Sequence, residues 1–218
     1  MNKLKCAILL LFVALGCKVA SAQNEIFDSP DNHPYFGVRV GLDITAPTWA
    51  KNDLLKADLF DGGAGFHAGA VYNIPLWKNL YFEPGLGIYY NTIGYDLTTG
   101  YNSTIDCSIR RFGFRVPFDF GYHFDFEPCS VAVFTGPQID LGITANSHSD
   151  SLDVNDGNEY GSDGLLNRFG LGWKFGAGVW FNRFVIEISG TVSMTDMMQS
   201  SMFTCHNNLV EITLGYNF

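Results

Sequence analysis

Residues 210–218 read Val-Glu-Ile-Thr-Leu-Gly-Tyr-Asn-Phe, and this closing stretch decides the fold class. Apolar side chains alternate there with polar or small ones, one residue at a time, up to Phe218. Because successive side chains of a strand point to opposite faces, this period of two predicts a β-strand with one apolar and one polar face. Residues 36–44 repeat the pattern near the other end of the chain, with Arg39 and Asp43 on the polar face.

Six further runs of the same kind lie near residues 64–74, 80–93, 108–124, 131–145, 167–181 and 184–194. Their connections are short at 75–79, 125–129 and 182–183, and long at 46–63, 95–107, 146–166 and 195–207. Short turns on one side and long polar loops on the other are typical of a transmembrane barrel. We therefore predict an all-β fold: an eight-stranded antiparallel up-and-down transmembrane β-barrel with short periplasmic turns and long extracellular loops. Ten strands remain an alternative, if the first or third long loop contains a hairpin.

The volume of the apolar side chains indicates which face looks outward. Each run carries several Phe, Tyr, Trp, Leu or Ile residues on its apolar face. The interior of an eight-stranded barrel is only just wide enough for side chains to fill, so the bulky face is expected to contact lipid. Glycines support this assignment, since those of the runs fall on the polar face with the exception of Gly190. Aromatic residues near the short turns predict an interfacial girdle, formed by Tyr72, Trp77, Phe82, Tyr122, Phe124, Phe181, Phe184, Tyr216 and Phe218.

The polar face carries charges of both signs, which we expect to meet in the lumen. Buried charges are tolerated when they are paired and hydrogen-bonded, so we predict a salt-bridge network that closes the barrel. An open channel is not expected, because wide channels belong to barrels of about 16 or more strands. The predicted lumen charge network comprises Arg39, Asp43, Glu83, Arg111, Arg115, Asp119, Asp140, Arg168, Lys174, Glu187 and Glu211.

The beginning of the chain has the composition of an export signal. Two lysines precede an apolar run over residues 6–15, and Ala20-Ser21-Ala22 supplies the small residues of a cleavage site. The run is shorter than the ~20 apolar residues of a membrane-spanning helix. We predict a cleavable signal peptide at 1–22, ending at Ala22, then a periplasmic tail at 23–34 and the barrel domain at 35–218. Lipidation at Cys17 is an alternative reading of Leu15-Gly16-Cys17.

Charge and cysteine content limit the partners and the covalent chemistry. The formal net charge is −9, and cleavage would remove three lysines and no acid. A chain this acidic repels nucleic acid, so no nucleic-acid partner is expected. Cleavage would also leave three cysteines, an odd number that argues against a disulfide framework. A single bridge between Cys107 and Cys205 remains open, with Cys129 unpaired in a periplasmic turn.

The residues of the last strand resemble the C-terminal signature of outer-membrane barrels, in which a final Phe is read by the barrel-assembly machinery. This resemblance implies that Tyr216 and Phe218 form the barrel-assembly signal. More of the chain resembles the PorT-like family of outer-membrane β-barrel domains, which is abundant in Bacteroidota. The resembling segments, spread over the predicted domain, are Tyr35–Gly41, Phe82–Gly87, Arg115–Phe118, Phe134–Pro137 and Gly176–Val179. The resemblance implies an integral protein in the outer membrane of a Gram-negative, Bacteroidota-like bacterium. It also raises the alternative of a part in protein export.

No set of nucleophile, base and orienting group can be assembled from the spacing, so we predict no catalytic residues, no enzyme activity and no cofactor. His67 is the histidine expected in the lumen, where it would hydrogen-bond a carboxylate. The loop at 146–166 carries Asp150, Asp153, Asp156, Glu159 and Asp163 without a Lys or Arg. We interpret it as a solvated acidic loop and predict no metal site, although clustered carboxylates also suit hard cations.

Three functions follow as alternatives. The first is a non-enzymatic structural barrel that presents surface loops, with membrane lipid, lipopolysaccharide and, during biogenesis, the assembly machinery as partners. The second is an accessory subunit of an outer-membrane export or assembly machine, with a secretion-system component as partner. The third is a small barrel that binds a ligand in its lumen or loops.

Overall fold

The computed structural model describes residues 33–50, 60–99, 103–126, 129–149, 158–161, 164–199 and 204–218. The predicted signal peptide, the cleavage site at Ala22, the alternative site at Cys17 and most of the predicted tail therefore lie outside the described residues. The same holds for Asp150, Asp153, Asp156 and Asp163 of the acidic loop. In the described part of the chain, no helix has the length and apolarity to cross a membrane.

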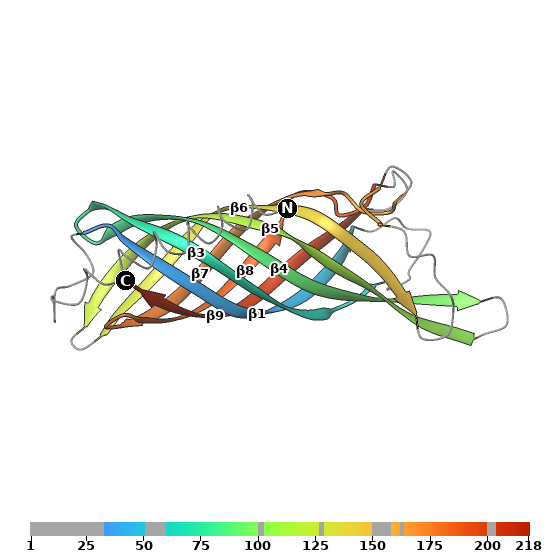
Figure 1. The fold of residues 1–218 in the computed structure, drawn as a ribbon, viewed down its shortest axis with the longest axis horizontal. Coiled ribbons are helices and arrows are strands. Elements are labelled where there is room, and N and C mark those ends of the chain that lie inside the picture. Colours follow the sequence, from blue (N-terminus) through green and yellow to red (C-terminus); the bar gives the residue numbers. More distant parts are fainter. Residues whose placement is uncertain are drawn as a thin grey trace, which may run out of the picture.

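The described chain forms one antiparallel sheet that closes on itself (Figure 1). Its strands are β1 (Tyr35–Ala50), β2 (Phe60–Asp61), β3 (Gly63–Trp77), β4 (Leu80–Thr99), β5 (Ser103–Phe126), β6 (Cys129–Ser149), β7 (Phe169–Phe181), β8 (Phe184–Ser193) and β9 (Thr204–Asn217). Every long strand pairs with its neighbours in the chain, and β1 pairs with β9, so eight long strands complete the ring. The predicted eight-stranded barrel is confirmed. The short β2 pairs only with the outer part of β4, at Tyr95 and Gly94, so the described part of the first long loop adds no further wall strand.

Two tight turns at the periplasmic end match the short connections expected from the sequence. Lys78 follows β3 and Asn182 follows β7, and both have positive φ angles, of 49° and 56°. Two-residue hairpins favour such angles because their twist then matches the twist of the strands. Asn is well suited to this conformation, whereas Lys pays a steric cost for it.

The prediction of a long loop at 95–107 is wrong. The β4–β5 ladder continues outward through Tyr95–Cys107 and ends with Thr99 opposite Ser103 (Figure 1). Strand β1 likewise reaches Ala50 and β6 reaches Ser149, past the limits expected from hydrophobic alternation. Backbone hydrogen bonds hold a ladder together whether or not its faces are apolar, so strands can continue where the membrane pattern ends.

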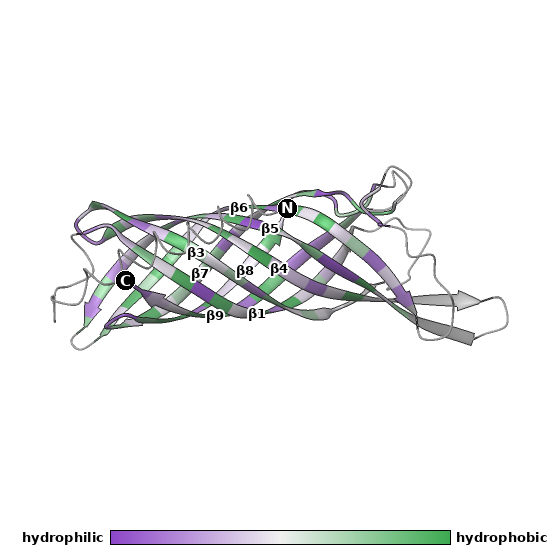
Figure 2. Ribbon diagram, in the orientation of Figure 1, coloured by the Kyte–Doolittle hydropathy of each residue, from purple (hydrophilic) through white to green (hydrophobic). Residues whose placement is uncertain are grey.

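The lipid-facing and lumen-facing sides follow the predicted alternation. Figure 2 shows hydrophobic and hydrophilic positions alternating along the strands. Outward apolar residues such as Leu42, Phe66 and Ile188 are exposed, whereas Arg39, Asp43 and Glu211 are buried. The apolar surface is therefore on the outside of the barrel, where lipid takes the place of a protein core.

Candidate functional site

Arg39 is the centre of an ion-pair cluster near the periplasmic end of the lumen. Its Nη2 lies 3.2 Å from Oε1 of Glu83 on β4, and its Nε lies 3.2 Å from Oε1 of Glu187 on β8. Arg39 Nη1 also donates a hydrogen bond to Oδ1 of Asn217, and Asn73 Nδ2 donates to Oε2 of Glu83. The planar guanidinium has donors on several sides, so one arginine can connect side chains from three strands.

Arg115 on β5 is the centre of a second cluster, at mid-lumen. Its Nε lies 3.1 Å from Oδ1 of Asp140, and its Nη1 lies 3.1 Å from Oδ2 of Asp43 and 2.5 Å from Oε1 of Glu211. Ser189 Oγ donates to the other carboxylate oxygen of Glu211. Three carboxylates from β1, β6 and β9 therefore converge on one guanidinium across the interior.

A separate ion pair joins Lys174 on β7 to Asp119 on β5, with Nζ 3.1 Å from Oδ2. The structure thus brings together nine of the residues expected in the lumen charge network: Arg39, Asp43, Glu83, Arg115, Asp119, Asp140, Lys174, Glu187 and Glu211. Their side chains reach across the middle of the barrel and border a cavity of about 50 Å³.

Two arginines of the predicted network are placed differently. Arg111 is buried, but it makes no ion pair with any acid in the described part of the chain, and its Nη1 lies 3.5 Å from Sδ of Met197. Arg168 precedes β7, is exposed, and donates from Nε to the carbonyl of Tyr160. The alternation had placed both residues on the polar face of a strand. Arg168 is not part of a strand, because β7 begins only at Phe169, and it belongs to the segment that folds over the barrel mouth.

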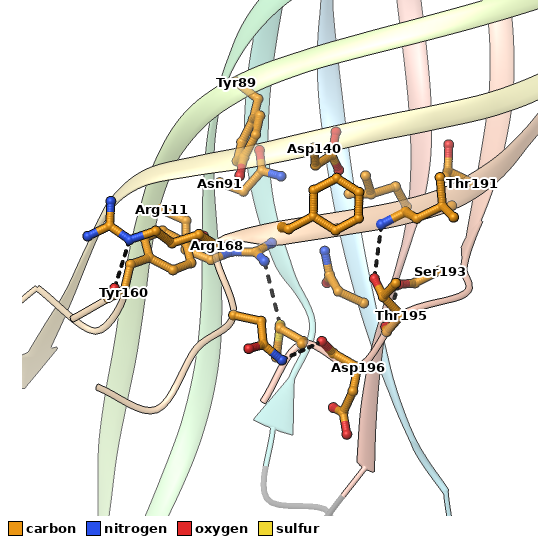
Figure 3. Close-up of a pocket in the computed structure, with 18 residues that line it drawn as sticks. Tyr89, Asn91, Arg111, Asp140, Tyr160, Arg168, Thr191, Ser193, Thr195 and Asp196 are labelled. Atoms are coloured by element: carbon orange, nitrogen blue, oxygen red, sulfur yellow. Dashed lines mark hydrogen bonds between the residues drawn. The ribbon is translucent and has the colours of Figure 1, made fainter. Parts of the chain in front are cut away.

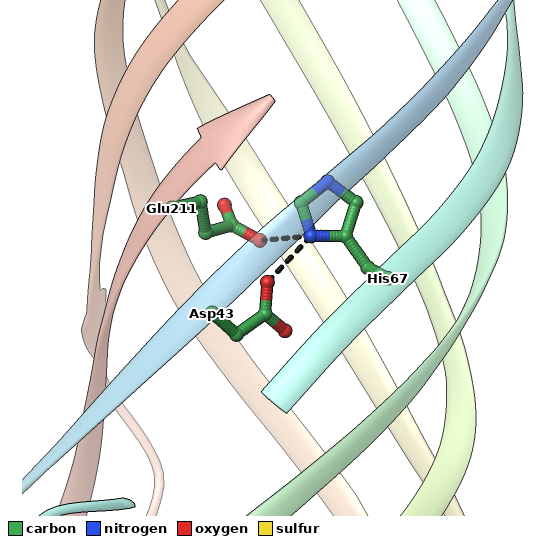
Figure 4. Close-up of side chains that lie close together, drawn as sticks. All are labelled: Asp43, His67 and Glu211. Carbon is green, nitrogen blue, oxygen red and sulfur yellow. Dashed lines mark hydrogen bonds and ion pairs between the residues drawn. The ribbon is translucent and has the colours of Figure 1, made fainter. Parts of the chain in front are cut away.

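His67 lies beside the Arg115 cluster (Figure 4). Its Nδ1 lies 2.5 Å from Oδ1 of Asp43 and 3.8 Å from Oε1 of Glu211, and its Nε2 lies 3.1 Å from Oγ1 of Thr213. One imidazole and two carboxylates within 4.8 Å are a donor set that zinc accepts. However, Arg115 Nη1 already contacts both carboxylates, so a guanidinium supplies the positive charge that a metal ion would bring.

The contacts from Asp43 to His67 and from His67 to Thr213 also have the arrangement of a catalytic triad, with an acid, a base and a hydroxyl nucleophile. Thr213 is buried, and Asp43 is shared between His67 and Arg115. The imidazole of His67, on β3, links Asp43 on β1 to Thr213 on β9 by hydrogen bonds, which is a structural role. This agrees with the carboxylate partner expected for His67.

An aromatic cluster closes the periplasmic end of the lumen, and sequence reasoning missed it. Tyr81, His123, Phe134 and Trp180 all point inward and are buried. The ring of His123 lies 4.5 Å from that of Tyr81 and 5.0 Å from that of Trp180, between centroids. The lumen therefore contains two histidines, His67 and His123, whereas the sequence predicted only His67. His123 still belongs to β5, which ends at Phe126, so its side chain keeps the inward direction of the alternation.

Lumen glycines make room for these rings. A Cβ at Gly178 would lie 2.7 Å from Cζ3 of Trp180, and a Cβ at Gly176 would lie 2.5 Å from Cζ of Phe134. Both glycines lie on the inner face, as expected from the alternation. The signal in the sequence was Gly178-Val179-Trp180, which places a large ring and a glycine next to each other on one face of β7.

An apolar cap closes the outer end of the lumen. Inward residues of the walls become apolar there, and segments 158–161, 164–166 and 194–199 fold onto them. The Asn146–Asn158 and Leu166–Met198 bridges fix these segments. The buried members of the cap are Ile93, Ile109, Ala145, Tyr160, Leu166, Met197, Met198 and Cys205. The loop residues 195–199 were expected to be part of a solvated loop, yet Met197 and Met198 are core residues of this cap.

The structure also places the three cysteines and the two residues of the expected assembly signal. Cys107, Cys129 and Cys205 are free thiols, so the possible Cys107–Cys205 bridge is not formed. Phe218 N donates to the carbonyl of Phe36, and the rings of Tyr216 and Phe218 lie 5.0 Å apart on the outer surface beside β1.

The geometry is that of a closed, lipid-facing barrel, and comparison with known proteins agrees with it. Residues 13–199 match the model of a family described as the outer membrane protein beta-barrel domain. The chain belongs to this family. It is accordingly an integral outer-membrane protein. No curated protein matches the chain.

Solved structures resemble this family member in fold. OprG of Pseudomonas aeruginosa is 13% identical, with 84% of this chain and 95% of that chain covered and a TM-score of 0.50. Neisserial surface protein A is 12% identical, with 84% and 97% covered and a TM-score of 0.44. Ail, the attachment invasion locus protein of Yersinia pestis, is 16% identical, with 85% and 99% covered and a TM-score of 0.41. The likeness to OprG shows a shared fold and nothing of shared function.

Proposed function

We propose that this protein is a non-enzymatic, closed barrel of a Gram-negative outer membrane, whose work is done by the loops that it presents at the cell surface. The observation that carries this proposal is the obstructed lumen, in which side chains cross the interior and leave small cavities of about 50 Å³. An aromatic cluster, a charge network and an apolar cap follow one another from the periplasmic to the outer end.

The charge network argues against a role in passive flow. Arg115 and Arg39 connect strands on different sides of the ring, so opening the lumen would require breaking several buried ion pairs. Removing one partner of a buried pair leaves an uncompensated charge, which costs about 3–5 kcal/mol. The buried pairs therefore favour the closed arrangement of the strands.

Conductance in a planar lipid bilayer tests the closed state. We expect the refolded protein to insert without discrete current steps. The control is the double variant Arg39→Ala, Arg115→Ala, which removes the two cations at the centres of the clusters and should conduct if it still migrates as a compact band before boiling. Regular current steps from the unaltered protein would refute a closed barrel.

A narrower placement among PorT-like barrels, with an accessory role in export, is the second candidate. It is supported by the resembling segments, but three of these contain Arg39, Glu83 and Arg115 and therefore coincide with the lumen clusters. The resemblance thus concerns the barrel interior more than any contact surface. We favour the loop-presenting function for that reason.

A native pull-down from detergent-solubilised outer membrane separates the two candidates. Tagged protein that elutes alone, with different mobility before and after boiling, supports a self-contained barrel. Secretion or assembly subunits in stoichiometric amounts in the eluate would contradict the self-contained barrel and support the accessory role. In that case, contacts would be sought first at the turns 75–79 and 125–129.

A further inference from the structure

Three neighbouring strands of the barrel wall each contain an internal proline: Pro84 in β4, Pro117 in β5 and Pro137 in β6. Proline has no N–H to donate to a ladder, so within sheets it is found mainly on edge strands, at strand ends and at bulges. A closed barrel has no edge strands. The three prolines therefore remove backbone hydrogen bonds from one continuous part of the wall.

The strand ladders are interrupted beside each of these prolines. Each interruption is two residue pairs long, as expected when a single N–H is missing from an antiparallel ladder. The unpaired positions are Tyr72 and Asn73 opposite Pro84 and Glu83, Gly85 and Leu86 opposite Pro117 and Val116, and Phe118 and Asp119 opposite Pro137 and Gly136. The other five ladders of the ring are continuous over their paired lengths.

The interruption between β4 and β5 is the least braced of the three. Asn73 donates a hydrogen bond to Glu83 across the β3–β4 interruption, and Arg115 pairs with Asp140 between β5 and β6. Among the described residues, no ion pair joins β4 directly to β5. Separation of these two strands would therefore leave every described ion pair of the lumen intact.

Side-chain contacts define the two ends of this interruption. Towards the periplasm, the rings of Phe82 and Phe120 stack across the two strands with their centroids 4.7 Å apart. Towards the outer end, the guanidinium carbon of Arg115 lies 5.0 Å from the centroid of the Tyr89 ring. The weak section of the wall lies between these two contacts.

A cavity of about 50 Å³ lies behind this section of the wall. Its lining there is formed by small or compact residues: Gly69 of β3, Gly85 and Gly87 of β4, and Pro117 of β5. Because glycine has no side chain, the backbone alone separates the cavity from the lipid-facing surface at these positions.

The same two strands are covered from the inside nearer the outer end of the barrel. There Tyr89 and Asn91 of β4 and Arg111 of β5 line a second cavity (Figure 3). The β4–β5 ladder is continuous from Gly87 outward, and these large side chains lie behind it. The interrupted ladder therefore coincides with the section that has only glycine and proline behind it.

The rest of the lining of the mid-lumen cavity is largely charged. Its charged members are Arg39, Glu83, Arg115, Asp119, Lys174, Glu187 and Glu211. A water molecule needs roughly 10–15 Å³ of such space, so the cavity has room for several waters or for one small solute. A molecule that enters here from the membrane meets hydrogen-bonding groups rather than an apolar core.

We propose that the wall opens locally between β4 and β5, at Gly85–Leu86 and Val116–Pro117, and forms a lateral port through which small uncharged solutes dissolved in the membrane reach the mid-lumen cavity. Sections with weak backbone pairing and few packed side chains open at the lowest cost in free energy. The port leads sideways into the lipid and ends at the ion pairs. It does not connect the two ends of the barrel, which stays closed to ion flow.

Modification of a single thiol in the cavity tests the port. Val71→Cys places that thiol on the cavity lining, with the five native cysteines changed to Ser. In lipid vesicles, uncharged methyl methanethiosulfonate should modify it in protein that migrates as a compact band before boiling. The sulfonatoethyl analogue, which stays in water, should not. Equal modification by both reagents would mean entry from a barrel end, and modification by neither would mean a closed wall. Either result would overturn the proposal.

Restoring the missing hydrogen bond locates the port. Pro117→Ala supplies an N–H to the β4–β5 ladder, and we expect it to slow the modification of Val71→Cys about fivefold, as one hydrogen bond would. Pro137→Ala is the matched control, because it restores the β5–β6 ladder, and it should leave the rate unchanged. No slowing in Pro117→Ala, or equal slowing in both variants, would overturn the assignment of the port to β4 and β5.

Discussion

Arg115 on β5 and Glu211 on β9 form an ion pair, Nη1 to Oε1, between strands that are four places apart in either direction around the ring of eight. The pair therefore spans the full width of the lumen. A barrel whose opposite walls are joined in this way resists both opening and flattening. The expected consequences can be measured one residue at a time.

Replacement of the central guanidinium should be severely destabilising. In Arg115→Met, the carboxylates of Asp43, Asp140 and Glu211 lose their shared partner, and we expect a loss of about 3–5 kcal/mol in the free energy of unfolding. Urea unfolding in lipid vesicles provides the measurement. Arg110→Met, an exposed position on the same strand, is the matched control and should change stability by about 0.5 kcal/mol or less. Equal effects of the two changes would contradict the structural role of the network.

Tryptophan fluorescence should distinguish the two faces of β7. Trp180 is 2% exposed inside the barrel, whereas Trp173 is 47% exposed on the outer face. With the other tryptophans changed to Phe, brominated lipids should strongly quench Trp173 and leave Trp180 nearly unaffected, because quenching requires contact with the acyl chains. Stronger quenching of Trp180 would mean that the inner and outer faces are reversed.

Adding one methyl group inside the aromatic cluster should be harmful. In Gly178→Ala the new Cβ would lie 2.7 Å from the Trp180 ring and 2.9 Å from the carbonyl oxygen of Ile186. Overpacking of this kind costs about 1–3 kcal/mol. Gly190→Ala is the control, since its nearest neighbour is the Phe175 ring at 3.3 Å on the lipid side, where the ring can move. Neither glycine has a positive φ, so the thermal midpoints of the two variants report packing alone.

The three cysteines of the barrel domain should differ in reactivity. Cys129, at the beginning of β6, is half-buried, whereas Cys107 and Cys205 are buried. With Cys6 and Cys17 changed to Ser, a maleimide should label Cys129 in the folded protein, and the other two only after boiling. The control is Cys129→Ser, in which the maleimide should no longer label the folded protein. Thiols that stay unreactive after boiling without a reductant would reveal a Cys107–Cys205 disulfide.

Much of the fold was determined by the sequence alone. The alternation that ends at Phe218 and begins near Phe36 predicted the strands, their number and the outward direction of the apolar face. The reason is local, because side chains alternate along any strand and eight strands leave little space inside. The positions of the lumen charges could be predicted for the same reason, down to Arg39, Arg115 and Lys174.

The tertiary structure alone decided which groups meet. Alternation cannot tell that Arg115 reaches β9 while Arg111, on the same face of the same strand, contacts Met197. Partners across a lumen depend on the register of all eight strands and on loops that fold inward, and both are set by contacts between distant parts of the chain. The apolar cap and the aromatic cluster follow from that long-range arrangement.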